Sequence, residues 1–289
     1  MRAPASVPIG TAEFDFLRSL VRDRSAIVLE PGKEYLVEGR MLPLMRSEAL
    51  ADPAALVAAL RAAPRGELER KAVEAMTTNE TSWFRDAHPF AALRTELLPT
   101  LIAARAVERR LRFWSTACSS GQEAYSLTLL VAEHFPELHD WDLQVVATDI
   151  SREMVERTRQ GRYGQLEINR GLPAQYLVKY FERQGTQWQV KPELRRLVQV
   201  RQMNLIEAWP VLPRFDVILL RNVLIYFDLA TKRAILRRVR QLLRPDGVLF
   251  LGSAETSTMV DDGWERLVTP GSIAYRPLAQ RPGNVAVPA

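Results

Sequence analysis

Residues 111–127, with the sequence LRFWSTACSSGQEAYSL, constrain the fold of this chain more than any other stretch. They begin as an apolar run suited to a buried strand, pass through small residues that allow a tight turn, and continue with apolar residues at helical spacing up to His134. This order of strand, loop and helix predicts a doubly wound α/β sheet, in which such a loop lies against a nucleotide-like ligand. The loop lacks the glycines of a dinucleotide fingerprint and the Gly-Lys-Ser/Thr ending of a phosphate-binding loop, so a purely structural role stays open.

Two further apolar runs predict parallel strands of the same sheet. Residues 143–148 lead to Asp149. An acidic residue at the end of the second strand is placed to accept hydrogen bonds from both hydroxyls of a ribose, although an aspartate there can instead cap the following helix. Residues 215–220 lead to Arg221 and Asn222. Polar residues directly after such a strand point into the ligand crevice.

Length and composition set the class of protein. A chain of 289 residues can bury one sizeable core with a smaller domain attached. No apolar stretch reaches the length of a membrane span and residues 1–10 have no apolar signal-peptide core, so we expect a cytoplasmic protein. Cys118 is the only cysteine, which excludes an internal disulfide, and without a histidine near it in sequence we expect it to pack rather than to act as a nucleophile. The net charge of +5 permits an acidic partner and does not require nucleic acid.

The first 75 residues predict a small helical domain. Residues 13–21 carry apolar side chains on one face, and residues 68–76 form another helical turn or two. Residues 53–60 follow Asp52, which is suited to be an N-cap, and begin with a proline at the first helical position. Three basic side chains of this region are candidates for contact with a partner: Lys33, Arg40 and Arg46.

Residues 76–86, MTTNETSWFRD, bring hydroxyls, an amide, two aromatic rings and an arginine into one short run. The hydroxyls and the amide suit the N-terminus of a helix, which is the structural interpretation. The density of polar groups beside Trp83 and Phe84 favours a ligand-binding wall. A helix from residue 88 to about residue 107 is then predicted to lead into the central strand.

Between residues 161 and 203 the alternation of strands and helices is interrupted. Residues 173–181 predict a helix, while residues 187–190 and 197–201 predict short strands. We therefore expect a small inserted subdomain in this region.

The C-terminal part returns to the α/β pattern. Residues 231–243 predict a helix with a solvated basic face. A turn is predicted at residues 245–247, a strand at 248–251 and an edge strand at 272–276. The tail from residue 278 to residue 289 has two prolines and little to bury, so we expect it to be disordered.

Four ordered segments together resemble the CheR chemotaxis protein methyltransferases. These segments are residues 77–86, 114–126, 147–151 and 221–228, and the resemblance extends from about residue 13 to residue 276. Such enzymes transfer a methyl group from S-adenosylmethionine (SAM) to glutamate side chains of membrane chemoreceptors, which produces a methyl ester. The resemblance implies a chemoreceptor cytoplasmic domain as protein substrate and SAM as cofactor, with no nucleic acid partner, no membrane insertion, a monomeric state and no metal.

The resemblance also implies an architecture. It comprises an N-terminal helical domain over residues 11–76, a linker and lead-in helix over 77–110, and a methyltransferase domain over 111–277. The methyltransferase domain has the class I SAM-methyltransferase fold, a doubly wound and mostly parallel sheet. It carries an antiparallel subdomain inserted at about residues 162–203. In some family members this subdomain docks a receptor peptide through a glycine-rich loop, but residues 183–188 are short with one glycine, so we expect no such docking here.

The resemblance implies which residues line the pocket, and individual roles are our hypotheses from the chemistry of those residues. Arg85 is expected to pair with the carboxylate of the cofactor, and Glu123 to offset its ammonium group. Tyr226 is expected to orient the incoming carboxylate, or alternatively to cap the core, so Arg85 and Tyr226 are the catalytic candidates. Gln122 and Ala124 stand where the family usually has glutamate and proline, which leaves the acidic role to Glu123. Arg221 and Asn222 are implied at the far side of the pocket. The full set of implied cofactor-binding residues is Asn79, Thr81, Arg85, Glu123, Asp149, Asn204, Leu205, Arg221 and Asn222.

The implied chemistry needs no general base. The methyl donor carries a positive charge on sulfur, and a glutamate carboxylate is already ionised at neutral pH. The protein has to hold sulfur, methyl carbon and carboxylate oxygen nearly in line and to remove the water that shields the two opposite charges.

Three other functions are alternatives: a methyltransferase that acts on a small molecule or on nucleic acid, a non-catalytic binding module, and a nicotinamide dehydrogenase. Methylation of a nucleic-acid base at an exocyclic amine generally uses an Asn/Asp-Pro-Pro-aromatic run, whereas residues 221–224 read RNVL here, and no phosphate-tracking basic patch is evident. A non-catalytic binding module would have no use for Asn79, Arg85, Glu123 and Asp149 together. A nicotinamide dehydrogenase is disfavoured by the missing glycine fingerprint.

Overall fold

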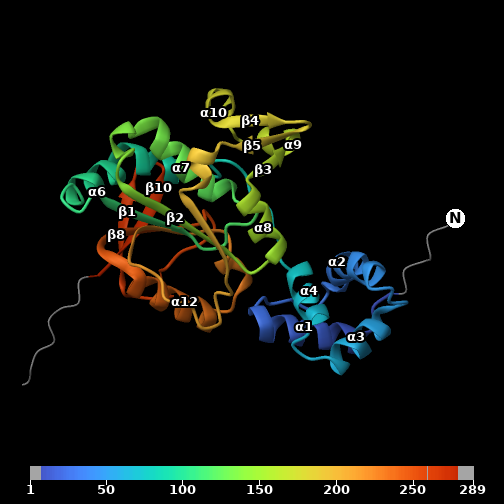
Figure 1. Ribbon diagram of the computed structural model, residues 1–289. Coiled ribbons are helices and arrows are strands. Elements are labelled where there is room, and N and C mark those ends of the chain that lie inside the picture. Colours follow the sequence, from blue (N-terminus) through green and yellow to red (C-terminus); the bar gives the residue numbers. More distant parts are fainter. Residues whose placement is uncertain (1–7, 259, 279–289) are drawn as a thin grey trace, which may run out of the picture.

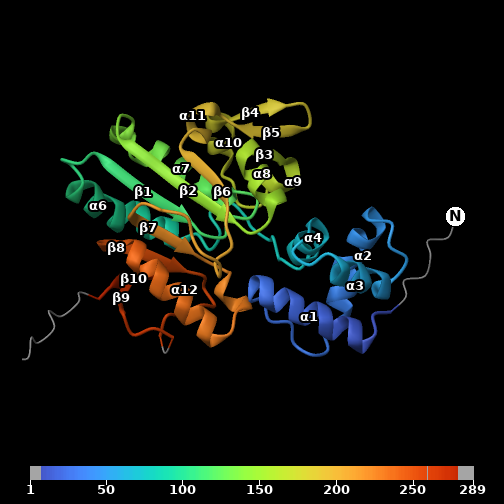
Figure 2. The same ribbon diagram turned by 60° about the horizontal axis from the view of Figure 1, so that its bottom comes forward.

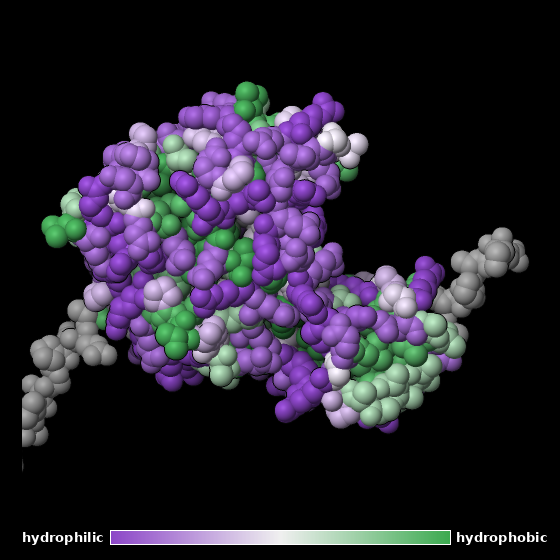
Figure 3. Space-filling view, in the orientation of Figure 1, coloured by the Kyte–Doolittle hydropathy of each residue, from purple (hydrophilic) through white to green (hydrophobic). Residues whose placement is uncertain are grey.

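The computed structural model describes residues 8–258 and 260–278, and Figure 1 shows a small group of N-terminal helices beside a larger α/β part. Almost all of the tail that we expected to be disordered, residues 279–289, lies outside the described residues. In the described part of the chain, no helix combines the length and the apolar character that crossing a bilayer requires. The space-filling view shows a mostly hydrophilic surface with a mildly apolar area over the N-terminal helices (Figure 3).

Four helices form the N-terminal group and share one apolar core. Asp52 caps the third of them as predicted, because its Oδ1 accepts a hydrogen bond from the backbone N–H of Ala55 at 2.8 Å. The second helix was not predicted as an element; it contains Gly39 and Pro43, two residues of low helix propensity. The helices are α1 (Thr11–Ser25), α2 (Glu34–Ser47), α3 (Pro53–Ala62) and α4 (Glu67–Ala75), and their core includes Phe14, Leu17, Val37, Leu56 and Leu60.

A seven-stranded sheet with the order β6-β2-β1-β7-β8-β10-β9 forms the centre of the larger part (Figure 2). The first five strands in this order pair in parallel, and β10 pairs antiparallel with both β8 and β9. The chain adds strands first on one side of β1 and then on the other, so the order reverses between β1 and β7, where open α/β sheets bind ligands. The strands are β1 (Arg110–Ser115), β2 (Asp142–Asp149), β6 (Val198–Gln202), β7 (Phe215–Leu220), β8 (Leu243–Leu251), β9 (Trp264–Thr269) and β10 (Ser272–Pro277).

Helices cover both faces of the sheet, which confirms the doubly wound fold. Phe113 of β1 packs on the side of α6 and α7, whereas the next residue, Trp114, packs on the side of α12. The helix expected over residues 88–107 is a helix with one π turn in it and ends at Ala104. The helices of the larger part outside the inserted subdomain are α5 (His88–Ala92), η1 (Leu93–Leu97), α6 (Leu98–Ala104), α7 (Gln122–His134), η2 (Pro136–Leu138), α8 (Arg152–Gln160), η3 (Leu224–Tyr226) and α12 (Leu229–Leu242).

The predicted inserted subdomain is a separate three-stranded antiparallel sheet with the order β3-β5-β4. Its range is shorter than the expected 162–203, because β6 pairs in parallel with β2 and belongs to the main sheet. The first four residues of β6 are half-buried and the last is exposed, and such a short strand carries no local signal of its partner. The subdomain elements are β3 (Arg162–Gly164), α9 (Gln165–Ile168), α10 (Ala174–Tyr180), β4 (Phe181–Gln184), β5 (Gln187–Val190) and α11 (Pro192–Arg195). The division of the whole chain into domains at residues 76 and 110 stays a prediction.

Three expectations for the C-terminal part were wrong. The predicted turn at residues 245–247 lies inside β8, where the register with β7 shifts. The strand at 272–276 is not an edge strand, because β9, which was not predicted, lies outside it. The basic face of α12 is not fully solvated, because two of its side chains bind other parts of the chain. Arg238 lies 3.8 Å from the ring centroid of Trp209, and Arg240 pairs with Asp261 at 3.0 Å.

Candidate active site

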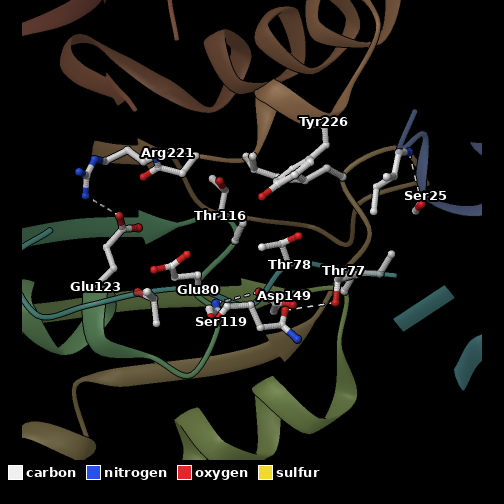
Figure 4. A pocket seen from close by; sticks show the side chains of 18 of the residues that line it. Ser25, Thr77, Thr78, Glu80, Thr116, Ser119, Glu123, Asp149, Arg221 and Tyr226 are labelled. Carbon is white, nitrogen blue, oxygen red and sulfur yellow. Dashed lines mark hydrogen bonds and ion pairs between the residues drawn. The ribbon is translucent and has the colours of Figure 1, made fainter. Parts of the chain in front are cut away.

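A pocket opens at the carboxyl ends of β1, β2 and β7, at the point where the strand order reverses (Figure 4). It encloses about 830 Å³ of space when its open mouth is counted. The linker after α4 and the chain just after α1 close two of its sides. All ten residues singled out from the sequence line it: Asn79, Thr81, Arg85, Glu123, Asp149, Asn204, Leu205, Arg221, Asn222 and Tyr226.

The loop after β1 is fixed by hydrogen bonds to the end of β2. The backbone N–H of Cys118 donates to the carbonyl of Thr148 at 2.9 Å, and that of Ser119 donates to Asp149 Oδ2 at 2.8 Å. Gly121 ends the loop with φ +94°, and a Cβ there would lie 2.8 Å from Thr158 Cγ2, so the position requires glycine. Burial raises the pKa of the Cys118 thiol well above its usual value, which agrees with a packing role.

Asp149 accepts hydrogen bonds from the backbone and also lines the pocket. Its two oxygens accept from the N–H groups of Ser119 and Ser151, while Ser151 itself caps α8. Burial raises the pKa of Asp149 to about 6, and the hydrogen bonds from these backbone amides oppose the increase. The carboxylate is therefore held rigidly at the end of β2, with lone pairs left to accept from a ligand.

Arg221 and Glu123 form an ion pair in the pocket wall. Arg221 Nη1 donates to Glu123 Oε2 at 2.9 Å, although the family resemblance implied that Arg221 lies across the pocket. Arg221 Nη2 donates to Asp86 Oδ2 and to the carbonyl of Arg85, both at 2.7 Å. The second oxygen of Glu123 accepts from Ser115 Oγ at 2.6 Å. Burial raises the pKa of Glu123, and the neighbouring Arg221 opposes this.

Arg85 differs from Arg221 in having no carboxylate partner among the described residues. Within the described part of the chain its side chain makes one hydrogen bond, from Nη1 to the carbonyl of Glu80 at 2.9 Å, and it is half-buried at the pocket wall. One guanidinium of this pocket is thus paired within the protein, and the other is available to an anionic ligand.

The linker beside Arg85 is held by Arg40 of α2. The guanidinium of Arg40 donates to the carbonyls of Met76 and Thr77 and to Thr78 Oγ1, the last at 2.8 Å. Arg40 had been a candidate for contact with a partner, but its side chain binds the segment that forms one pocket wall. Asn79, further along the linker, accepts from Ser119 Oγ through its carbonyl at 2.8 Å.

The N-terminal helices contact the opposite wall. Asn204 Nδ2 donates to the carbonyl of Arg24 at 2.7 Å, and the backbone N–H of Val28 donates to the carbonyl of Tyr226 at 2.9 Å. Leu205 is buried in the core below. In Figure 4 the ring of Tyr226 extends into the pocket, on the side away from the Arg221–Glu123 pair.

Several lining residues were missed in the sequence. Ser25 is the last residue of α1 and Ile27 follows the helix. Both lie about 50 residues before the linker, so no local pattern signals their place in the pocket. Thr116 was only part of a quoted motif, yet its Oγ1 is buried without a hydrogen-bond partner in the described part of the chain. An unpartnered buried hydroxyl in a pocket wall indicates a polar ligand atom. Further lining residues include Thr78, Glu80, Ala117, Ile150, Met203, Val223 and Phe227.

Comparison with known proteins gives consistent matches over most of the chain. Residues 79–270 match the family model described as CheR methyltransferase, SAM binding domain, and residues 12–77 match the one described as CheR methyltransferase, all-alpha domain. The chain is 40% identical to chemotaxis protein methyltransferase 1 of Pseudomonas aeruginosa, over 92% of this chain and 97% of that protein. It is 37% identical to the chemotaxis protein methyltransferase of Vibrio parahaemolyticus, over 94% of this chain and 98% of that protein.

Proposed function

This chain belongs to the CheR family of SAM-dependent chemotaxis methyltransferases, and we propose that it methylates glutamate carboxylates in the cytoplasmic domain of a chemoreceptor, forming methyl esters. SAM is its cofactor, and when bound it supplies a methyl group on a positively charged sulfur. The identity of the acceptor is the part that this proposal adds.

The pocket offers what a cofactor with an adenosine and an amino-acid end requires. Asp149 provides a fixed acceptor for hydroxyl groups at the end of β2. Arg85 provides a guanidinium without a carboxylate partner, and Thr116 an unpartnered buried hydroxyl. Apolar side chains beside these groups suit a flat aromatic ring: Ile150, Met203 and Leu205.

One observation carries the choice of acceptor: the described residues that line the pocket include no uncommitted general base. Among the described lining residues there is no histidine, lysine or cysteine. Glu123 is engaged by Ser115 and Arg221, and Glu80 by Arg170 at 2.9 Å. Asp149 is held by two backbone amides, and its remaining lone pairs are the ones proposed to accept from the ribose hydroxyls. An acceptor that must lose a proton would need such a base, whereas a glutamate carboxylate arrives ionised at neutral pH. The site therefore suits a carboxylate acceptor better than an amine.

The residues of the chain then act by position and by exclusion of water. Arg85 binds the carboxylate of the cofactor, which a planar guanidinium can do with two hydrogen bonds. Tyr226 extends into the pocket, where its hydroxyl orients the incoming carboxylate. Opposite charges on donor and acceptor disappear as the methyl group moves, so a site that excludes water favours the reaction. We further propose that the enzyme acts as a monomer in the cytoplasm.

The stability of the product to base tests this proposal. The enzyme is incubated with SAM labelled in the methyl group and with a receptor cytoplasmic fragment, and the labelled fragment is then treated with mild alkali. A methyl ester releases the label as methanol, and mass spectrometry of untreated fragment places it on glutamate. A fragment in which the labelled glutamates are replaced by glutamine serves as the matched control. Label that survives alkali would show transfer to nitrogen and would contradict the proposal.

A further inference from the structure

Glu255 lies just beyond the end of β8 and is not one of the pocket-lining residues. Its carboxylate accepts three backbone hydrogen bonds. Oε2 accepts from the N–H of Asn222 at 2.8 Å and from that of Gly252 at 2.7 Å, and Oε1 accepts from the N–H of Ile225 at 3.1 Å. Two of these three donors belong to the turn at residues 221–226, which follows β7 and presents Arg221, Asn222 and Tyr226 to the pocket.

At its first residue the turn is anchored by the buried ion pairs of Arg221, and the side chain of Leu224 is buried in the core. Its other residues have less support. Asn222 has φ +57°, in the left-handed region that costs free energy for a residue other than glycine. The side chain of Ile225 is 48% exposed, so little packing holds that position. Outside the strand ladders, the described residues provide one further backbone bond from another part of the chain, which the N–H of Val28 donates to the carbonyl of Tyr226. A turn of this kind keeps its shape only if its surroundings determine it.

The backbone at Gly252 approaches the same turn closely. A Cβ at Gly252 would lie 2.7 Å from Asn222 Nδ2 and 2.8 Å from the backbone nitrogen of Asn222. Three N–H dipoles therefore point at one small volume, which only an acceptor can occupy favourably. Glu255 places both of its oxygens there.

We propose that Glu255 is a positioning residue for methyl transfer: it fixes the turn at residues 221–226 and thereby the place of Tyr226 in the pocket. The assignment of a role in catalysis rests on the proposed function. Glu255 touches neither cofactor nor acceptor in this account, and it acts through the three backbone amides that it binds.

A carboxylate is required because of the number and place of the donors. In Glu255→Gln the side chain keeps its length, but one of its two terminal atoms becomes an NH₂ group. If the amide oxygen takes the place of Oε2, the bonds to Asn222 and Gly252 survive and the NH₂ group faces the N–H of Ile225. The NH₂ group of the new side chain and the N–H of Ile225 are both donors and cannot bond to each other. The turn therefore loses its hydrogen bond at the residue before Tyr226.

The experiment compares the parent enzyme with Glu255→Gln and with the control Glu265→Gln, which changes an exposed glutamate on β9. Hydrogen exchange of the peptide that contains residues 221–226, SAM affinity by calorimetry, the thermal midpoint and steady-state methyl transfer are measured for each. We expect Glu255→Gln to exchange faster in this peptide and to lower kcat about 10- to 100-fold, because small misplacements of positioning groups have effects of this size. SAM affinity and the KM of the receptor fragment should stay within about threefold of the parent values.

Two results would overturn the proposal. One is a Glu255→Gln enzyme whose kcat and exchange equal those of Glu265→Gln. The other is a parallel fall of kcat, SAM affinity and thermal midpoint, which would assign Glu255 a general structural role. A failure of the proposed function can be told apart from a failure of this proposal. It would appear in the parent enzyme as methyl label on the receptor fragment that is stable to alkali. Hydrogen exchange and SAM affinity are measured without an acceptor and do not depend on that result.

Discussion

Arg221 Nη1 lies 2.9 Å from Glu123 Oε2, so two charged side chains expected on different sides of the pocket form one ion pair in its wall. The side chain of Arg221 is 1% exposed, and its other terminal nitrogen, Nη2, donates to Asp86 and to the carbonyl of Arg85. The charge of Glu123 is therefore balanced within the protein before any ligand arrives. We therefore expect Glu123 to act on the ammonium group of the cofactor as part of this network rather than as a free carboxylate.

Glu123→Ala should destabilise the fold. It leaves the buried guanidinium of Arg221 with Asp86 as its only carboxylate partner, and breaking a buried ion pair in this way costs about 3 kcal/mol. Urea unfolding followed by circular dichroism measures the loss. Glu156→Ala is the control, because Glu156 pairs with Arg159 on the surface, where we expect little change. Equal unfolding midpoints for the two variants would show that the Arg221–Glu123 pair does not contribute to the stability of the fold.

Arg85→Ala should weaken SAM binding without destabilising the fold. Arg85 has no carboxylate partner in the described chain, so its removal should leave the unfolding midpoint nearly unchanged. SAM affinity should fall about 10- to 100-fold, as expected for the loss of a charge-assisted bidentate contact. Calorimetric titration checks this, with Arg183→Ala on the exposed strand β4 as the control. An Arg85→Ala enzyme that binds SAM as tightly as the control would exclude Arg85 from the cofactor site.

Asp149 should make SAM binding dependent on pH. Burial raises its pKa from 3.8 to about 6, and only the ionised form accepts from both ribose hydroxyls. Binding therefore lowers this pKa, so affinity is complete only at a pH well above 6, begins to fall near pH 6, and falls by up to about tenfold per pH unit below it. The effect on the stability of the free protein has the opposite sign: the folded state holds this proton more tightly, so the contribution of Asp149 decreases as the pH rises from 3.8 to about 6. Asp149→Asn should bind SAM weakly at every pH, and a variant that keeps the parent's affinity and pH profile would remove Asp149 from the site.

Arg40→Ala should loosen the pocket from outside it. The variant loses the donors that hold the carbonyls of Met76 and Thr77 and the hydroxyl of Thr78, and two of these residues line the pocket. We expect SAM affinity to fall about three- to tenfold, since the bonds are lost one step away from the ligand. Arg40→Lys keeps the charge without the fork of donors and should show a similar loss. If Arg40→Lys restores full affinity, charge rather than the fixed linker is what matters.

The central strands were predictable because the physics that forms them is local. Strands β1, β2 and β7 are buried apolar runs that end in polar residues, and those residues meet because parallel strands share one carboxyl edge. The N-cap of α3 was predictable for the same reason, since Asp52 and the proline after it act within one turn.

Features decided by distant parts of the chain were not predictable in this way. The place of β6 beside β2 depends on a partner about 50 residues earlier, and the charged residues of β9 hide its strand pattern. Arg221 was identified as a site residue, but its partners Glu123 and Asp86 are 98 and 135 residues away. A sequence motif names the residues of a site, and tertiary packing decides which of them bind each other and which stay free for a ligand.

The central claim is that one pocket, between the linker and the ends of β1, β2 and β7, holds the methyl donor next to Tyr226. A crystal structure of the enzyme with S-adenosylhomocysteine, the product that remains after methyl transfer, tests this most directly. We predict hydrogen bonds from both ribose hydroxyls to Asp149, an ion pair between the amino-acid carboxylate and Arg85, and a sulfur atom that faces Tyr226. Product bound elsewhere, or bound here without contact to Asp149 and Arg85, would contradict the account.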